Sequence, residues 1–410
     1  MKNYESYKDS GVDWIGEIPK SWSSSRLKFI SSIEKGRIPS VTFQDQEKDM
    51  VPYLSMDYLR GNTESPEYVK TNDPKLIPVD LNDLLVLWDG SKAGEIVKAK
   101  PGALSSTMGK IHISDTNFDI SFLSYFLKSA ERYLQENTVG MGIPHVNGTI
   151  LRSLFITKPS KTEQSQIARY LDHQTAIIDE LIQRKKKLVL ALEAKRKSVI
   201  NEAVTKGLNP NVRMKDSGID WIGEIPEHWV LAKLKYLVSM KSGNTITSDT
   251  IEDFGDYPVY GGNGLRGYTS NFTNEGNFVL IGRQGALCGN INYAGGKFWA
   301  SEHAVVVYPI LYMDTFYLGE LLRLMNLNQY SESAAQPGIS VGKILNLIVP
   351  KISFQEQIDI SYFIKNKTEK IDSLNSKIQE QLVKLKEYRQ SLISEVVTGK
   401  IDVRDWEINN

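Results

Sequence analysis

The 410-residue chain has little of what disulfides and metal sites require. It contains one cysteine, Cys288, and five histidines. A single cysteine cannot form an intramolecular disulfide, and the histidines lack the spacing typical of metal ligands. We therefore expect neither a disulfide nor a metal site. Such sparing use of cysteine is typical of a reducing compartment.

Long apolar runs and net charge are missing as well. No apolar segment approaches the roughly 18–20 residues that a membrane span requires, and the N-terminal MKNYESYKDSG lacks the apolar core of a signal peptide. The 49 basic residues balance 49 acidic ones, so any nucleic-acid interaction must depend on local patches. We expect a soluble, cytoplasmic protein with no membrane partner.

What the chain does contain is a long internal repeat. Residues 8–22 read KDSGVDWIGEIPKSW, and residues 215–229 read KDSGIDWIGEIPEHW. The two copies differ at three of fifteen positions, at a constant offset of 207 residues. A match of this length indicates a duplication, so the rest of the chain can be analysed as two half-molecules.

Each repeat copy is followed by a segment that predicts short strands, turns and one helix. In the first half, 84–87 is a short apolar run, 110–113 alternates in polarity as a half-buried strand does, and 118–133 has helical spacing. GMGIP at 140–144 predicts a loop. The second half shows the same pattern, with strands at 278–281 and 304–307 and a helix at 314–328. We predict two α+β globules.

Two long segments, 163–205 and 355–398, contain neither glycine nor proline. Each carries apolar residues at spacings of three, four or seven and so predicts a long amphipathic helix. The predicted buried positions are Leu171, Ile178, Leu181, Leu188, Leu192 and Val199 in the first helix, and Ile364, Ile371, Ile378, Leu385 and Leu392 in the second.

The two helices are repeats of one another at an offset of 193 residues. TAIIDEL at 175–181 matches TEKIDSL at 368–374, and EAVT at 202–205 matches EVVT at 395–398. Counted from matching isoleucines, both are 39 residues long, or about 58 Å at ~1.5 Å per residue. We expect them to pair antiparallel under a pseudo-two-fold axis. The predicted domains are 1–160, helix 161–206, 207–352, and helix plus tail 353–410.

The chain resembles the specificity (S) subunits of type I restriction–modification enzymes over its whole length. The resemblance rests on the two DWIGEIP junctions, on the Glu-Gln-x-x-Ile entry to each helix after Pro159 and Pro350, and on the exits EAVTKG and EVVTGK. In the second globule, 257–269, 280–290 and 297–307 are similar to one type of target-recognition domain.

The resemblance implies two target-recognition domains separated by two antiparallel helices, each reading half of a split site in double-stranded DNA. It also implies two methyltransferase (modification) subunits on the helices, and restriction/translocase subunits in the full enzyme. The partners would carry S-adenosylmethionine and ATP, and this chain would bind no cofactor. The sequences of the two globules barely match, whereas the two junctions match closely. We therefore expect an asymmetric, interrupted DNA site, and we expect the length of its unread gap to depend on helix length.

Two alternatives remain, a self-contained DNA-modifying enzyme and a structural coiled-coil adaptor. An adenine methyltransferase needs an Asn/Asp-Pro-Pro-aromatic loop, but the nearest Asn-Pro, at 209–210, is better explained as a helix stop. The Gly-rich segments 260–264 and 338–343 do not match cofactor or phosphate loops. Glu193 and Lys195 lie on a charged helical face, so we predict no catalytic residue.

DNA contacts are predicted from loop positions and side-chain chemistry. Arginine pairs with guanine and asparagine or glutamine with adenine, whereas lysines bind phosphates. Trp88-Asp89 matches the position of Gly282-Arg283, and the loops that contain His145 and Gln336 occupy comparable positions in the two halves. The DNA-binding candidates are Trp88, Lys92, Lys110, His145, Asn147, Arg266, Arg283, Gln284, Lys297, His303, Gln336 and Lys343. For each one the alternative is a structural or merely solvated residue. The basic run 184–197 could lie along the phosphates of the unread spacer or meet an acidic partner subunit, and the alternative is a solvated helix face.

Overall fold

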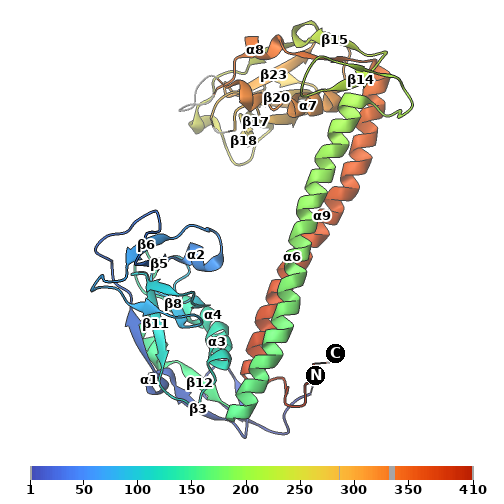
Figure 1. Ribbon diagram of the computed structural model, residues 1–410. Coiled ribbons are helices and arrows are strands. Elements are labelled where there is room, and N and C mark those ends of the chain that lie inside the picture. Colours follow the sequence, from blue (N-terminus) through green and yellow to red (C-terminus); the bar gives the residue numbers. More distant parts are fainter. Residues whose placement is uncertain (1, 286, 332–337, 409–410) are drawn as a thin grey trace. The chain divides into compact units, whose positions relative to one another are not determined.

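A computed structural model describes residues 2–285, 287–331 and 338–408 (Figure 1). The chain forms two compact units. The first comprises the residues up to Lys185 together with those from Glu380 onward, and the second comprises Lys186–Gln379. Each unit therefore contains one strand-rich globule and one half of each long helix.

The globule of the first unit contains two four-stranded sheets. One has the order β4-β11-β8-β9 and is antiparallel. The other has the order β6-β5-β10-β7, with β5 and β10 parallel. The strands are β1 (Tyr7–Asp9), β2 (Glu17–Pro19), β3 (Ser23–Arg26), β4 (Ser31–Lys35), β5 (Met50–Leu54), β6 (Glu67–Lys70), β7 (Pro78–Val79), β8 (Leu84–Leu87), β9 (Ile96–Lys98), β10 (Gly102–Leu104), β11 (Met108–Ile113) and β12 (Phe155–Lys158). The helices are α1 (Leu27–Ile30), α2 (Met56–Arg60), α3 (Ile120–Ser129), α4 (Glu131–Glu136) and α5 (Gly148–Ser153).

The globule of the second unit repeats this topology. Its sheets have the orders β16-β23-β20-β21 and β18-β17-β22-β19, and β17 and β22 are the parallel pair. The strands are β13 (Met214–Asp216), β14 (Glu224–Pro226), β15 (Val230–Lys233), β16 (Val238–Ser242), β17 (Tyr257–Gly261), β18 (Gly264–Thr269), β19 (Asn274–Glu275), β20 (Phe278–Gly282), β21 (Ile291–Ala294), β22 (Lys297–Ala300), β23 (Ala304–Pro309) and β24 (Ile348–Lys351). The helices are α7 (Thr315–Leu324) and α8 (Val341–Leu345), with 3₁₀ turns η1 (Leu234–Tyr236), η2 (Ser248–Thr250) and η3 (Leu327–Tyr330).

The predicted strands and helices are confirmed, and their side chains form the globule cores. All four residues of β8 are buried, as are the first four of β23. Helix α3 buries four apolar side chains along one face, and Asp119 caps its N-terminus by accepting a hydrogen bond from the Phe122 amide. Asp314 caps α7 in the same way through the Tyr317 amide. The α+β class and the internal repeat are therefore correct.

The long helices are α6 (Lys161–Lys206) and α9 (Phe354–Val397), and they pair antiparallel in each unit. In the first unit, Arg389 makes two hydrogen bonds of 2.9 and 3.0 Å to the Asp179 carboxylate. In the second, Arg196 binds Asp372 at 3.0 Å. The farther along α6 a residue lies, the earlier its partner lies on α9, which confirms the predicted direction.

The predicted buried stripe of α6 is wrong at two positions. Leu181 and Leu188 are exposed, whereas their neighbours Ile182 and Val189 are buried. Leu181 and Leu188 have the same helical spacing as Ile182 and Val189, so the apolar pattern alone could not show which pair is buried. The position of the partner helix decides which stripe is covered.

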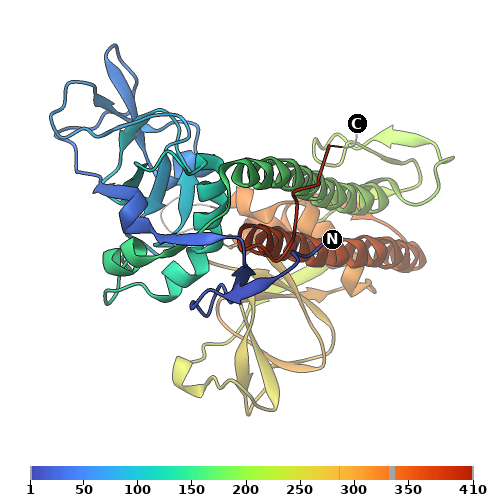
Figure 2. The same ribbon diagram turned by 90° about the horizontal axis from the view of Figure 1, so that it is seen from below.

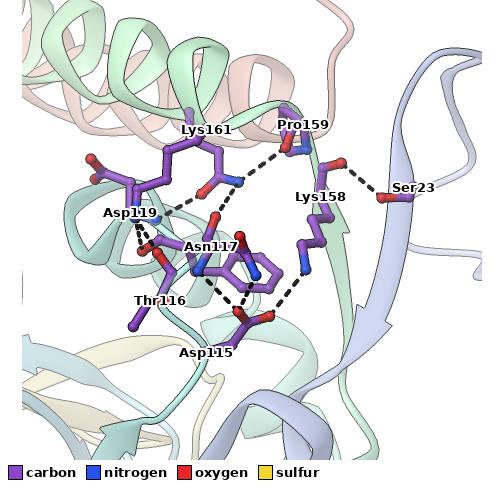
Figure 3. A network of polar contacts seen from close by, with 10 residues as sticks. Ser23, Asp115, Thr116, Asn117, Asp119, Lys158, Pro159 and Lys161 are labelled. Atoms are coloured by element: carbon purple, nitrogen blue, oxygen red, sulfur yellow. Dashed lines mark hydrogen bonds and ion pairs between the residues drawn. The ribbon is translucent and has the colours of Figure 1, made fainter.

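Each long helix is joined to its globule by a set of polar contacts within the unit, of which the glutamine bonds occur in both units. Figure 3 shows the set at the start of α6, where Lys158 pairs with Asp115 at 3.0 Å and Asn117 binds the same carboxylate. Gln164 accepts a hydrogen bond from the Asp119 amide and donates to the Pro159 carbonyl. Gln357 makes the same two bonds in the second unit, to the Asp314 amide and the Ile352 carbonyl.

The repeated DWIGEIP stretch ends in a buried tryptophan that docks on the first turn of a long helix. The Trp22 indole donates to the Glu163 carboxylate at 3.0 Å, and the Trp229 indole donates to Glu356 at 2.9 Å. Both rings are 1% exposed. Trp14, in the same stretch, is half-buried and stacks on Tyr133.

Each buried indole also packs against the glycine that ends the other helix. A Cβ atom on Gly207 would lie 3.2 Å from the Trp229 ring, and one on Gly399 would lie 3.1 Å from the Trp22 ring. Both glycines have a φ above +70°, which side chains disfavour. The tryptophan therefore connects the end of one helix to the start of the other within each unit.

The first unit is built from both ends of the chain. The Asp402 amide donates to the Lys2 carbonyl at 2.9 Å, and Gln166 on α6 donates to the Val403 carbonyl. These contacts hold the N-terminal segment beside the C-terminal tail (Figure 2). In the second unit, the segment after α6 continues directly into the junction repeat. In the first unit, the tail after α9 takes the place of that segment. Among the described helices, none is both long and apolar enough to cross a membrane.

We predict that Trp22→Phe lowers the free energy of unfolding of the full chain by about 1–2 kcal/mol, because the partly buried Glu163 carboxylate loses a hydrogen-bond donor. Urea unfolding followed by circular dichroism measures this loss. Trp14→Phe is the matched control, since it keeps a ring against Tyr133. Equal losses in the two variants would contradict the importance of the indole–carboxylate bond.

Candidate nucleic-acid interface

Strand register defines which residues of the two globules are equivalent. Met108 pairs with Leu87, and Ala304 pairs with Gly282 at the same place in the second globule. The residue after each strand then makes the same two backbone bonds. Trp88 donates to Thr107 and accepts from Val146, while Arg283 donates to His303 and accepts from Ile339. Trp88 therefore corresponds to Arg283, which corrects our alignment of Trp88 with Gly282 by one residue.

A cleft of about 480 Å³ opens beside these strand ends in the first globule. Lys92, one of the predicted residues, is exposed on its wall. Arg60 contributes a second cation, which is paired with Glu95. The remaining lining is Tyr53, Ser55, Met56, Ser65, Pro66, Glu67, Leu87, Gly90, Ser91, Ser105, Ser106 and Thr107. Seven of the fourteen lining residues carry a hydroxyl group and two carry a cation, and both kinds of group can bind the sugar–phosphate backbone.

The second globule has a cleft of about 550 Å³ at the equivalent place. It brings together three predicted residues that are far apart in the sequence, Arg266, Gln284 and His303. Gly261 allows the aliphatic part of Arg266 to approach, because a Cβ there would lie 2.5 Å from the Arg266 Cδ. The other lining residues are Gly262, Asn263, Gly264, Leu265 and Leu287. The guanidinium and carboxamide groups that line this cleft offer the donors and acceptors that base edges require.

Two more predicted residues lie beside the first cleft rather than in it. Trp88 is half-buried and packs over Gly109 and Gly148, so its ring has a structural role. His145 lies on the loop opposite, where its Nδ1 is 2.6 Å from the Asp89 carboxylate. Lys35 pairs with the other oxygen of Asp89 at 3.0 Å. The sequence pattern missed Asp89 and Lys35 as site residues, because only the fold brings their segments together.

A third group of predicted residues is engaged elsewhere. Lys110 pairs with Asp83 at 2.6 Å and is 17% exposed. Asn147 caps α5 by accepting hydrogen bonds from the Thr149 and Ile150 amides. Lys297 lies 4.8 Å from the centre of the Phe272 ring.

The last three predicted DNA-binding residues are Arg283, Lys343 and Gln336, and the structure describes the first two. Arg283 is exposed at the strand end beside the second cleft. Lys343 is exposed on α8. Gln336 lies outside the described residues. Within the described part of the chain, no three His, Cys, Asp or Glu side chains gather in a way that could hold a metal ion.

Known proteins share both the sequence pattern and the fold. A family model for the type I restriction modification DNA specificity domain matches residues 19–191 and 226–384. The chain is 30% identical to the type I restriction enzyme MjaVIII specificity subunit of Methanocaldococcus jannaschii, over 95% of both chains. It is 33% identical to the EcoprrI specificity subunit of Escherichia coli, over 64% of this chain and 63% of that one.

Solved structures share the fold at low sequence identity. A chain from a structure concerned with complex assembly and conformational transition of the type I R-M system matches with a TM-score of 0.73 and 15% identity, covering 94% of this chain and 99% of that one. The HsdS subunit from Thermoanaerobacter tengcongensis matches with a TM-score of 0.52 and 16% identity, covering 94% and 98%. These matches show the same arrangement of strands and long helices.

Proposed function

Because this chain belongs to the family of type I restriction–modification DNA specificity subunits, we propose that it reads an asymmetric, bipartite site in double-stranded DNA. Each globule reads one half-site, and partner subunits in the cytoplasm methylate adenine or cleave the DNA. The observation that carries this proposal is the pair of equivalent clefts in two globules of identical sheet order.

The two clefts share a position but not a chemistry, which supports an asymmetric site. The first presents Lys92 among serine and threonine hydroxyls, while the second presents Arg266, Gln284 and His303. Base recognition depends on the side chains that face the groove. Two different sets on one framework should therefore select two different half-sites.

The chain itself is expected to be non-catalytic. Its sequence lacks the Asn/Asp-Pro-Pro-aromatic loop of adenine methyltransferases, and none of its Gly-rich segments matches a methyl-donor loop. S-adenosylmethionine and ATP would bind to the methyltransferase and restriction/translocase subunits. Methylation of DNA by the purified chain alone would favour the alternative of a self-contained enzyme.

Exposed apolar residues on the helical pair support two equivalent partner sites. Leu181 and Val383 are 40% and 55% exposed in the first unit, and Leu190 and Leu374 are 65% and 45% exposed in the second. Leu181 matches Leu374, and Leu190 matches Val383, at the helix offset of 193 residues. Identical partners require equivalent surfaces, so these pairs fit two copies of one methyltransferase subunit.

We predict that replacing residues 230–352 with the corresponding globule of a relative changes one half-site only. The segment is closed at its ends by the pairing of β15 with β24, so it can be exchanged as a unit. Methylome sequencing of cells that contain the partner subunits reports both half-sites and the gap. A change in both half-sites, or no sequence selection at all, would contradict modular reading and support a structural adaptor.

We predict that inserting seven residues at matched positions of α6 and α9 widens the unread gap by about three base pairs. Seven residues add roughly 10 Å of helix and preserve the heptad phase, while DNA rises about 3.4 Å per base pair. The insertions would follow Lys185 and Gln379, the residues at which the two units meet in sequence. The same methylome measurement applies, and an unchanged gap would refute the helix-length argument.

We predict that Lys92→Ala weakens DNA binding at all sequences and lowers the salt slope of log K by about 0.9, the value for one lost phosphate contact. Among the described contacts Lys92 has no ion pair, whereas Lys110 is held by Asp83. Lys110→Ala is therefore the control and should leave the slope unchanged. Titrations of labelled DNA at several salt concentrations, with the assembled complex, measure both. A larger slope change for Lys110→Ala would reverse these assignments.

A further inference from the structure

A three-residue polar cluster lies beside the cleft of the first globule. The Asp89 carboxylate receives His145 Nδ1 at 2.6 Å on one oxygen and Lys35 Nζ at 3.0 Å on the other. Lys35 also lies 5.7 Å from the centre of the Trp88 ring. Lys35 comes from β4, Asp89 from the loop after β8 and His145 from the loop before α5, so the fold assembles the cluster.

The imidazole of His145 is held in one orientation. A backbone bridge joins Asp89 to His145, and the Gly90 amide donates to the Pro144 carbonyl at 2.9 Å. Gly140 leaves room for the ring, because a Cβ there would lie 2.8 Å from His145 Cδ2. The side chain is nevertheless 46% exposed. Among the described contacts, its Nε2 atom has no hydrogen-bond partner.

The carboxylate determines which nitrogen of His145 carries the proton. An ionised carboxylate accepts hydrogen bonds but donates none, so the neutral imidazole must place its proton on Nδ1. The exposed Nε2 atom is then a hydrogen-bond acceptor. In the major groove, the donors that match such an acceptor are the amino groups of adenine N6 and cytosine N4.

In the described part of the second globule, the equivalent positions do not form this cluster. Strand register places Gln284 where the first globule has Asp89, and the equivalent backbone bridge joins Gln284 to Gly338 instead of a histidine. The framework of the loop is shared, but the carboxylate and the imidazole are not. The cluster therefore belongs to the chemistry that distinguishes one reader from the other.

We propose that His145 is a specificity-determining residue that accepts a hydrogen bond from an adenine or cytosine amino group in the half-site of the first globule, with Asp89 as its positioning residue. This inference rests on the proposed function, because it assumes that the first globule reads DNA. It adds the class of base and the atom that reads it.

The discriminating variant is Asp89→Asn. Lys35 attracts the carboxamide oxygen, so the amide NH₂ faces His145 Nδ1 and donates to it. The imidazole proton then moves to Nε2, which becomes a donor that favours guanine. Selection from a DNA library randomised over both half-sites, using the complex of the full chain with its partner subunits, measures base preference. We expect preference at one base pair of the first half-site to shift by roughly fivefold to tenfold, within the range of one base contact.

Two further variants separate positioning from mere structural support. His145→Ala should lose discrimination at that same base pair. The double variant, which combines Asp89→Asn with His145→Ala, should behave as His145→Ala does, because Asp89 acts through the imidazole. Preferences in the second half-site serve as the internal control and should not change in any variant.

Three outcomes would overturn the inference. If Asp89→Asn weakens selection evenly across the first half-site without changing any base, Asp89 is only structural. If Asp89→Asn and His145→Ala leave every preference unchanged while both half-sites are still selected, the inference fails and the proposed function stands. If the wild-type complex selects no sequence, the proposed function fails as well.

Discussion

The hydrogen bond between a buried indole and the carboxylate in the first turn of a long helix is the contact on which the rest of the structure depends. It occurs once in each unit, as Trp22 with Glu163 and as Trp229 with Glu356. The same ring covers the glycine that ends the other helix. One side chain therefore contacts both the start of one helix and the end of the other. The globule begins directly after this side chain in the sequence. This explains why the stretch leading to the tryptophan is the most similar part of the two halves.

The framework and the reading surfaces follow different physical constraints. The sheet order, the helix caps at Asp119 and Asp314, and the glutamine contacts at the helix starts are the same in both units. These groups satisfy buried backbone atoms, so few alternatives are possible. The cleft walls are exposed, and their side chains can change at little cost in stability. A duplicated framework can thus hold two different recognition surfaces, as an asymmetric DNA site requires.

Local patterns predicted the elements well and failed where two patterns fitted equally. The strand at 84–87 and the long helices are present, because buried runs and helical spacing depend on nearby residues only. The choice of Leu181 rather than Ile182 as the buried residue, and the alignment of Trp88 with Gly282 rather than Arg283, were each wrong by one position. Both depend on a partner segment distant in the sequence. For the same reason, Asp89 and Lys35 could not be identified from the segments that carry them.

The sequence by itself determined the duplication, the α+β class, the antiparallel helices and the family, because each depends on a repeated motif or on periodicity within one segment. Only the tertiary structure decided which residues share a cleft. Arg266 comes from β18, whereas Gln284 and His303 come from two separate loops, and His145 meets Asp89 across 56 residues of chain. Hydrogen-bonding geometry between distant segments is set by strand register and loop closure, which no local pattern records.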